Sequence, residues 1–192
     1  MANQHLGIIS DPTVGKDTVA QMVRDLIAPH TVQIINYSDR MKEELNARGV
    51  PLTRQNFQNE SRRLRGAFGE DHLGQVVRYR AIHSQADLPI LTGIRRAEDI
   101  MPLRTLPGSL YLLYLTAPAK KRWEWQQARR QNADEGGKSF EQFLKEDQDE
   151  CEIHIRQIGQ DLADGRIDNN GTLDELRGKV RLMLRDRFNF KV

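Results

Sequence analysis

The sequence predicts an α/β fold with a five-stranded parallel sheet and helices on both faces. Short apolar runs alternate with longer stretches of helical periodicity along the 192 residues, which is the pattern of successive strand–helix units. The runs are almost wholly apolar, as strands are when helices cover both faces of their sheet. A chain of this length can bury a substantial core, so we expect residues 1–192 to form a single domain.

Five segments are expected to be strands, because each is apolar and bounded by turn residues. Pro89 and Gly93 bound the third segment, and Pro118 stops the fourth. The expected strands are residues 6–10, 31–37, 88–94, 109–117, and a short strand that runs into a turn within 164–172.

Apolar residues spaced three and four positions apart predict the helices between these strands. The apolar faces of the first and last helices are formed by Val19, Val23, Leu26 and Ile27, and by Leu173, Leu176, Val180 and Met183. The other helical segments are 41–49, two helices within 54–84 broken near Gly69, and 119–160 with an interruption at 132–139.

Composition narrows the class of protein. Charged residues make up 29% of the chain and the net charge is +2, so no strong positive field favours nucleic acid or a membrane surface. No apolar run approaches the roughly 20 residues that span a bilayer, and no signal peptide is visible. The single cysteine, Cys151, fits a reducing compartment, so we expect a cytoplasmic protein.

In sheets of this kind, ligands bind where the chain leaves the carboxyl ends of the strands. The functional residues are therefore expected in residues 10–18, 36–42, 92–99, the region around 129–138, and 168–171.

The first of these segments, residues 10–18, partly matches a phosphate loop of the form G-x-x-x-x-G-K-[ST] between a strand and a helix. Gly15 and Lys16 match, and such a loop binds phosphate through backbone N–H groups, the positive helix end and the lysine charge. Ser10 replaces the first glycine, and Asp17 takes the hydroxyl position, one residue before Thr18. The alternative interpretation is an ordinary strand-to-helix turn.

Three side chains of this loop affect whether it can bind phosphate. Thr13 and Val14 replace the usual small residues, and a β-branched valine resists a positive φ. A carboxylate at Asp17 that faced the cradle would repel phosphate by several kcal/mol, an order-of-magnitude figure. Asp17 is compatible with phosphate binding if it points outward at the first helical turn, or contacts Mg²⁺ through water.

Later segments resemble a known family. "ADGRIDNNGTLDEL" (163–176) resembles the closing strand, turn and helix of dephospho-coenzyme A kinases. "GKDT" (15–18), "NYSDRMKEEL" (36–45) and "ILTGIRR" (90–96) follow in the order expected for that family, which belongs to the wider nucleoside monophosphate kinase group of P-loop proteins. The second and third of these segments also resemble deoxynucleoside monophosphate kinases and phosphomevalonate kinases.

The resemblance implies an ATP-dependent phosphotransferase with a closing lid. Carried over by position, the phosphate loop and the 168–171 turn would hold ATP, with the turn against the adenine. The residues so assigned are Thr13, Val14, Gly15, Lys16, Asp17, Thr18, Asn169, Asn170 and Gly171, of which Thr18 and Asp17 are the expected Mg²⁺ ligands.

The acceptor side is implied in the same way. Asp39 occupies the position of an acidic residue that accepts the proton of the attacking hydroxyl. Arg95 and Arg96 lie in a segment similar to Asp-Gly-x-Pro-Arg of nucleotide kinases, with Thr92 in place of the aspartate, a metal-shell carboxylate. Asp39 could instead cap the following helix, although Ser38 and Met41 do not form a capping box.

Two further segments are predicted around this core. Residues 122–140 are expected to be a lid, with Arg122, Arg129 and Arg130 on a helix before a Gly136–Gly137 hinge. Residues 54–84, including the arginine-rich stretch 62–69, are expected to be an acceptor-side helical insert. A charged, solvent-facing helix is the alternative for each. The expected catalytic residues are Lys16, Asp39, Arg95, Arg96, Arg129 and Arg130.

The predicted reaction is transfer of the ATP γ-phosphoryl group to dephospho-coenzyme A or a (deoxy)nucleoside monophosphate. A nucleotide-binding regulatory protein with a degenerate loop is the first alternative. A nucleic-acid-binding protein that uses arginines at 62–65 and 177–187 is the second, and the net charge of +2 gives it little support. The sequence leaves the acceptor, the nucleobase preference and the oligomeric state open.

Overall fold

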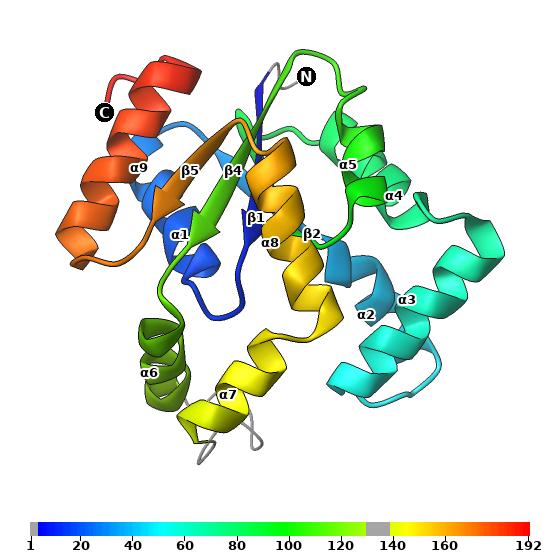
Figure 1. Cartoon of the computed structure of the whole chain (residues 1–192). Coiled ribbons are helices and arrows are strands. Elements are labelled where there is room, and N and C mark those ends of the chain that lie inside the picture. Colours follow the sequence, from blue (N-terminus) through cyan, green and yellow to red (C-terminus); the bar gives the residue numbers. More distant parts are fainter. Residues whose placement is uncertain (1–3, 130–138) are drawn as a thin grey trace. The chain divides into compact units, whose positions relative to one another are not determined.

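The computed structural model describes residues 4–129 and 139–192, and it confirms the predicted sheet (Figure 1). Five parallel strands are arranged in the order β2-β3-β1-β4-β5, with helices on both sides. The strands are β1 (Gln4–Ser10), β2 (Val32–Asn36), β3 (Leu88–Ile94), β4 (Ser109–Thr116) and β5 (Gly165–Asp168).

The described part of the chain also contains helices, most of which were predicted. They are α1 (Lys16–Ile27), α2 (Tyr37–Ala47), α3 (Arg54–Phe68), α4 (His72–Ile82), α5 (Ala97–Leu103), α6 (Ala119–Arg129), α7 (Phe140–Asp147), α8 (Glu150–Leu162) and α9 (Leu173–Phe188). Gly69, with φ 106°, ends α3 and confirms the predicted break. The short helix α5 was not predicted, and neither was the break between α7 and α8 at 148–149. Within the described residues, no helix is both long and apolar enough to cross a membrane.

Contacts group the chain into two compact units. The first unit contains β2, β3 and helices α2 to α5, with the starts of β1 and β4. The second unit contains the end of β1, the following turn, α1, the end of β4, β5 and helices α6 to α9.

The core of the first unit lies between the β2–β3 pair and the helices around it. The two strands are in parallel register, from Val32 opposite Leu88 to Asn36 opposite Thr92. Ile90, from β3, and Leu64, from α3, are completely buried. Burying each such side chain contributes about 1.5–3 kcal/mol.

The second unit has an equivalent core. β4 and β5 are paired from Leu113 opposite Gly165 to Thr116 opposite Asp168, and α1 packs along α9. Val23 of α1 and Val180 of α9 are completely buried, and the predicted apolar faces are confirmed except at Leu173, which is 67% exposed.

The start of α2 differs from the prediction. The strand was expected to include Tyr37 and the helix to begin at 41, but β2 ends at Asn36 and α2 begins at Tyr37. Asn36 is the N-cap: its side chain accepts from the N–H of Ser38, and Asp39 accepts from the N–H of Asn36 at 3.0 Å. A capping box is therefore present, one that begins at Asn36 rather than Ser38.

Gly93 makes room for this cap. Its φ is +85°, and a Cβ built on it would lie 2.7 Å from Oδ1 of Asn36. The glycine at the end of β3 therefore allows the Asn36 side chain to reach the first turn of α2.

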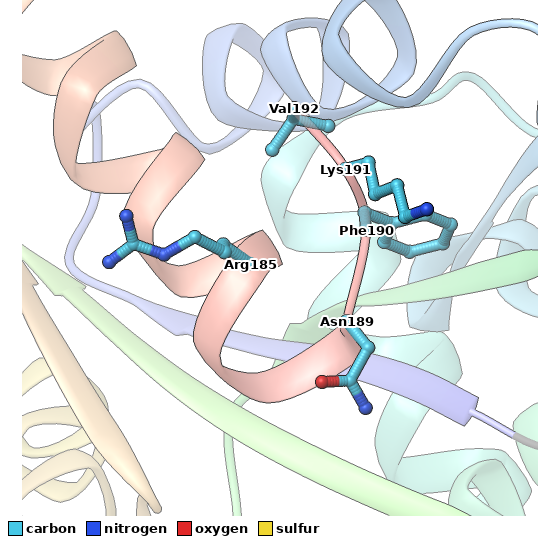
Figure 2. Close-up of a pocket in the computed structure, with 5 residues that line it drawn as sticks. All are labelled: Arg185, Asn189, Phe190, Lys191 and Val192. Atoms are coloured by element: carbon cyan, nitrogen blue, oxygen red, sulfur yellow. The ribbon is translucent and has the colours of Figure 1, made fainter.

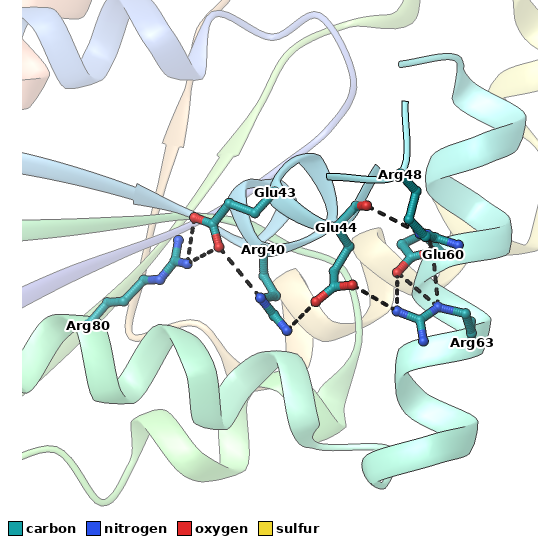
Figure 3. A network of polar contacts seen from close by, with 7 residues as sticks. All are labelled: Arg40, Glu43, Glu44, Arg48, Glu60, Arg63 and Arg80. Atoms are coloured by element: carbon teal, nitrogen blue, oxygen red, sulfur yellow. Dashed lines mark hydrogen bonds and ion pairs between the residues drawn. The ribbon is translucent and has the colours of Figure 1, made fainter. Parts of the chain in front are cut away.

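Ion pairs join α2 to α3 and α4 (Figure 3). On one side, Arg80 of α4 contacts both carboxylate oxygens of Glu43 at 2.7 Å. On the other, Glu60 of α3 is only 2% exposed and pairs with Arg48 and, at 2.7 Å, with Arg63. Arg63 also contacts Glu44 at 3.2 Å, so the network fixes α2 against both neighbouring helices.

We predict that Glu60→Gln lowers the free energy of unfolding at neutral pH by about 1–3 kcal/mol. The hydrogen bonds of Arg63 hold the pKa of Glu60 below its ordinary 4.5, although burial opposes this. The stabilisation is therefore complete above pH 4.5 and is lost as the pH falls through the lower folded-state pKa.

Urea denaturation of wild type and variant tests this at neutral pH and well below pH 4.5. The difference between the two proteins should shrink in acid. Glu43→Gln is the control, because its carboxylate is half exposed and its pairs are worth about 1 kcal/mol or less. Equal losses in the two variants would contradict the prediction.

Candidate functional site

The predicted phosphate loop lies in the second unit, between the end of β1 and the start of α1 (Figure 1). Thr13 has φ 57° and Gly15 has φ 92°, both in the left-handed region. Val14 does not take the positive φ that its β-branched side chain would resist, and that side chain is 1% exposed, in the core. The bend expected of a phosphate loop is therefore present, with Thr13 rather than Val14 carrying the strain.

Two long-range hydrogen bonds hold this bend. The side-chain amide of Asn169 donates to the carbonyl of Val14 at 2.9 Å, and the hydroxyl of Thr13 donates to the carbonyl of Arg122 at 3.1 Å. A Cβ at Gly15 would lie 3.4 Å from Nδ2 of Asn169, so glycine also leaves space for the amide. The loop is fixed by the protein itself, which is the preorganisation that anion binding needs.

The first turn of α1 presents positive charge beside the loop. Its N-cap is Gly15, which has no side chain to cap the first N–H groups, and the helix dipole is positive at this end. Nζ of Lys16 lies 3.0 Å from Oδ1 of Asp17, whose side chain is 63% exposed. Asp17 therefore lies at the surface and pairs with the lysine, and a phosphate at Lys16 would compete with this weak surface pair.

The donor set fits Mg²⁺. Thr18 supplies a hydroxyl on the first turn of α1, and Asp17 supplies a carboxylate one residue earlier; both are the hard oxygen donors that Mg²⁺ prefers. Among the described residues no cluster of three or more His, Cys, Asp and Glu side chains forms a complete metal site. Phosphate oxygens and water would have to complete the coordination, as is usual for Mg²⁺.

The turn after β5 divides into a buried and an exposed part. Asn169 is buried and its amide is used to hold Val14, whereas Asn170 and Gly171 are exposed. Nζ of Lys121 donates to the carbonyl of Asn170. A Cβ at Gly171 would collide with the carboxylate of Glu175, which caps α9.

In the first unit, the predicted acceptor-side residues lie at the carboxyl ends of β2 and β3. Asp39 is part of the capping box of α2 and is partly exposed. Arg95 and Arg96 are exposed just after β3, and Arg96 contacts Glu70 at 2.8 Å. Thr92 is buried, and its hydroxyl has no hydrogen-bond partner among the described residues.

The lid prediction needs a correction at Arg122. This side chain is buried and makes two hydrogen bonds to Asp147, at 2.6 and 2.8 Å, so it belongs to the packed interior of the second unit. Arg129 ends α6, and only its backbone is described. Arg130 and the Gly136–Gly137 hinge lie outside the described residues.

Asp11 was not among the predicted site residues, although it lies inside the predicted phosphate loop. Its carboxylate is 3% exposed and accepts from the hydroxyls of Tyr114 at 2.9 Å and Thr116 at 2.6 Å. Burial and the charge of Asp11 raise the pKa of Tyr114 to about 12, so the phenol stays a donor. The available signal was an aspartate directly after an apolar strand.

One surface hollow lies away from these residues, at the C-terminal end of α9 (Figure 2). It is open, and none of the predicted site residues lines it. Its lining is Arg185, Asn189, Phe190, Lys191 and Val192.

No family model matches the chain. It is similar to a UPF0200 protein of Pyrococcus horikoshii, 25% identical over 177 residues, covering 90% of this chain and 91% of the relative. A UPF0200/UPF0201 protein of Archaeoglobus fulgidus is 24% identical over 182 residues, covering 93% of this chain. The match covers 54% of that relative, so this chain spans about half its length.

Solved structures show which fold this is. Shikimate kinase from Acinetobacter baumannii, in complex with shikimate, is 18% identical with a TM-score of 0.54, covering 100% of this chain and 96% of that one. Shikimate kinase from Bacteroides thetaiotaomicron is 13% identical with a TM-score of 0.58 (96% and 98% covered). A gluconokinase from Sinorhizobium meliloti is 12% identical with a TM-score of 0.55 (97% of each). The chain therefore has the same fold as these kinases.

We predict that Asn169→Ala lowers the free energy of unfolding by about 1–2 kcal/mol, because the buried carbonyl of Val14 loses its donor. Chemical denaturation measures the loss. Asn170→Ala is the matched control, since that side chain is exposed, and it should change stability by less than about 0.5 kcal/mol. A loss no larger for Asn169→Ala than for its neighbour would show that the amide does not hold the loop.

Proposed function

We propose that the chain is an ATP-dependent phosphotransferase whose acceptor is dephospho-coenzyme A or a (deoxy)nucleoside monophosphate. The observation that carries the proposal is the phosphate loop: a bend through Thr13 and Gly15 that is held by Asn169, with Lys16 at the start of α1. The likeness of the whole fold to small-molecule kinases supports it. The resemblance to dephospho-coenzyme A kinases supports the choice of acceptor.

In this proposal the phosphate loop binds the triphosphate. The backbone N–H groups from Thr13 to Thr18 surround the β- and γ-phosphates, and Lys16 moves from Asp17 to the phosphate oxygens. Mg²⁺, held by Thr18 and by Asp17 through water, would neutralise phosphate charge. Asn170 and Gly171 are the exposed residues left to contact the nucleobase, because Asn169 is engaged with the loop.

The transfer step requires few groups. The acceptor hydroxyl oxygen bonds to the γ-phosphorus while the bond from that phosphorus to the β–γ bridging oxygen breaks, and ADP leaves with the electron pair. Asp39 orients the hydroxyl and accepts its proton. Arg95, Arg96, Arg129 and Arg130 neutralise the charge on the transferring group. Arg65 of the insert is only 6% exposed and pairs with the buried Asp99, so it is not assigned to the acceptor.

ADP release tests the reaction directly. Wild type is assayed with ATP, Mg²⁺ and, separately, dephospho-coenzyme A and each common nucleoside monophosphate. Lys16→Ala should lower kcat by about 100-fold or more, because a charge that stabilises the transition state is lost. Lys191→Ala, an exposed lysine outside the loop, should keep the wild-type rate. ATP binding without ADP release for every acceptor would identify a nucleotide-binding regulatory protein instead.

We also predict that Asp17→Asn tightens ATP binding when Mg²⁺ is absent. The variant frees Lys16 from its surface pair and removes a negative charge near the phosphates, which should lower Kd by about two- to fivefold. Isothermal titration calorimetry in EDTA measures the change. An unchanged or weaker affinity would mean that the Lys16–Asp17 pair does not compete with phosphate.

A further inference from the structure

Four buried or partly buried side chains of alternating charge connect the phosphate loop to α6, α7 and α8, all within the second unit. We propose that this charge chain, Asp11–Arg122–Asp147–Arg156, positions the phosphate loop, with Arg122 as the positioning residue that fixes Thr13. The proposal rests on the proposed function, since it assigns the loop to ATP. The charge chain assigns a role to four residues that the proposed reaction does not use.

The contacts form a continuous series. Nε of Arg122 lies 4.0 Å from Asp11, and its two terminal nitrogens contact Asp147 at 2.6 and 2.8 Å. Arg156 contacts the Asp147 carboxylate at 3.2 Å and its carbonyl at 2.5 Å. Nε of Arg122 also donates to the carbonyl of Ala117 at 3.0 Å, and the guanidinium lies 5.5 Å from the centre of the Phe143 ring.

The central pair of the charge chain is largely buried. Arg122 is 3% exposed and Asp147 is 10% exposed. Burial alone would raise the pKa of Asp147, but the hydrogen bonds and charge of Arg122 keep that pKa below its ordinary value. Burial alone would lower the pKa of Arg122, and Asp147 keeps it raised. Both groups therefore stay charged, and since buried pairs contribute little net stability, we attribute a geometric role to this one.

Arg122 reaches the loop at two points. Its carbonyl accepts the hydrogen bond from the hydroxyl of Thr13, the residue in the strained left-handed conformation. Its guanidinium faces the carboxylate of Asp11, which Tyr114 and Thr116 hold from β4. A movement of Arg122 would therefore shift both ends of the Asp11–Thr13 segment, and with it the N–H groups offered to phosphate.

A buried pair in the first unit provides a matched control. Arg65 contacts Asp99 at 2.7 Å, and their side chains are 6% and 1% exposed. It is likewise a buried arginine–aspartate contact, and it lies in the unit that does not contain the phosphate loop. It therefore separates a general loss of stability from a specific effect on the loop.

The experiment compares Asp147→Asn with Asp99→Asn in two measurements. The first is amide hydrogen exchange of residues 11–18 without nucleotide, and the second is Kd for ATP without acceptor. Asp147→Asn should speed exchange in the loop and raise Kd for ATP by about tenfold. Asp99→Asn should leave loop exchange unchanged and Kd within about twofold, even if its Tm falls as much.

Loop exchange and Kd that stay at wild-type values in Asp147→Asn would overturn the proposal. If Asp147→Asn does not fold, Thr13→Val is measured instead, because it deletes the hydroxyl that donates to the carbonyl of Arg122. Thr13→Val should speed loop exchange and raise Kd for ATP, and Thr13→Ser should return both to their wild-type values. Faster loop exchange in a protein that releases no ADP would support the positioning role while contradicting the proposed reaction, so the two failures are distinguishable.

Discussion

The left-handed bend at Thr13 and Gly15 is the constraint on which the second unit depends. A strand that runs directly into a helix exposes the helix N–H groups to an anion only if the chain turns sharply between them. Glycine adopts one of the two positive φ values without strain, whereas threonine adopts the other with backbone strain. The amide of Asn169 and the carbonyl of Arg122 hold the bend from two other elements, the turn after β5 and α6.

In the first unit, side chains likewise hold the point at which a strand passes into a helix, the start of α2. The side chain of Asn36 and the carboxylate of Asp39 cap the helix, and Gly93 leaves the space that this cap requires. The ion pairs of α3 and α4 then fix the other end of α2. Asp39 is thereby held on a rigid helix start, which is what its proposed role in orienting the acceptor hydroxyl needs.

The strands, the order of elements and the break at Gly69 follow from local patterns, and so they could be predicted. Apolar runs and helical spacing depend on residues close in sequence. The start of α2 was missed because Asn36 is both the last residue of β2 and the N-cap of α2, so no turn separates the two elements. Arg122 was assigned to a lid because neither Asp147 nor Asp11 is near it in sequence, and burial by distant partners leaves no local signal. For the same reason, the hydrogen bond from Asn169 to the carbonyl of Val14 was not predicted.

A crystal structure with a non-hydrolysable ATP analogue tests the central claim most directly. The account predicts that the β- and γ-phosphates lie against the N–H groups between Thr13 and Thr18, with Lys16 turned from Asp17 to the phosphates. It also predicts that Thr13 and Gly15 keep their positive φ values. An analogue bound elsewhere, or a loop that straightens to admit it, would contradict the account.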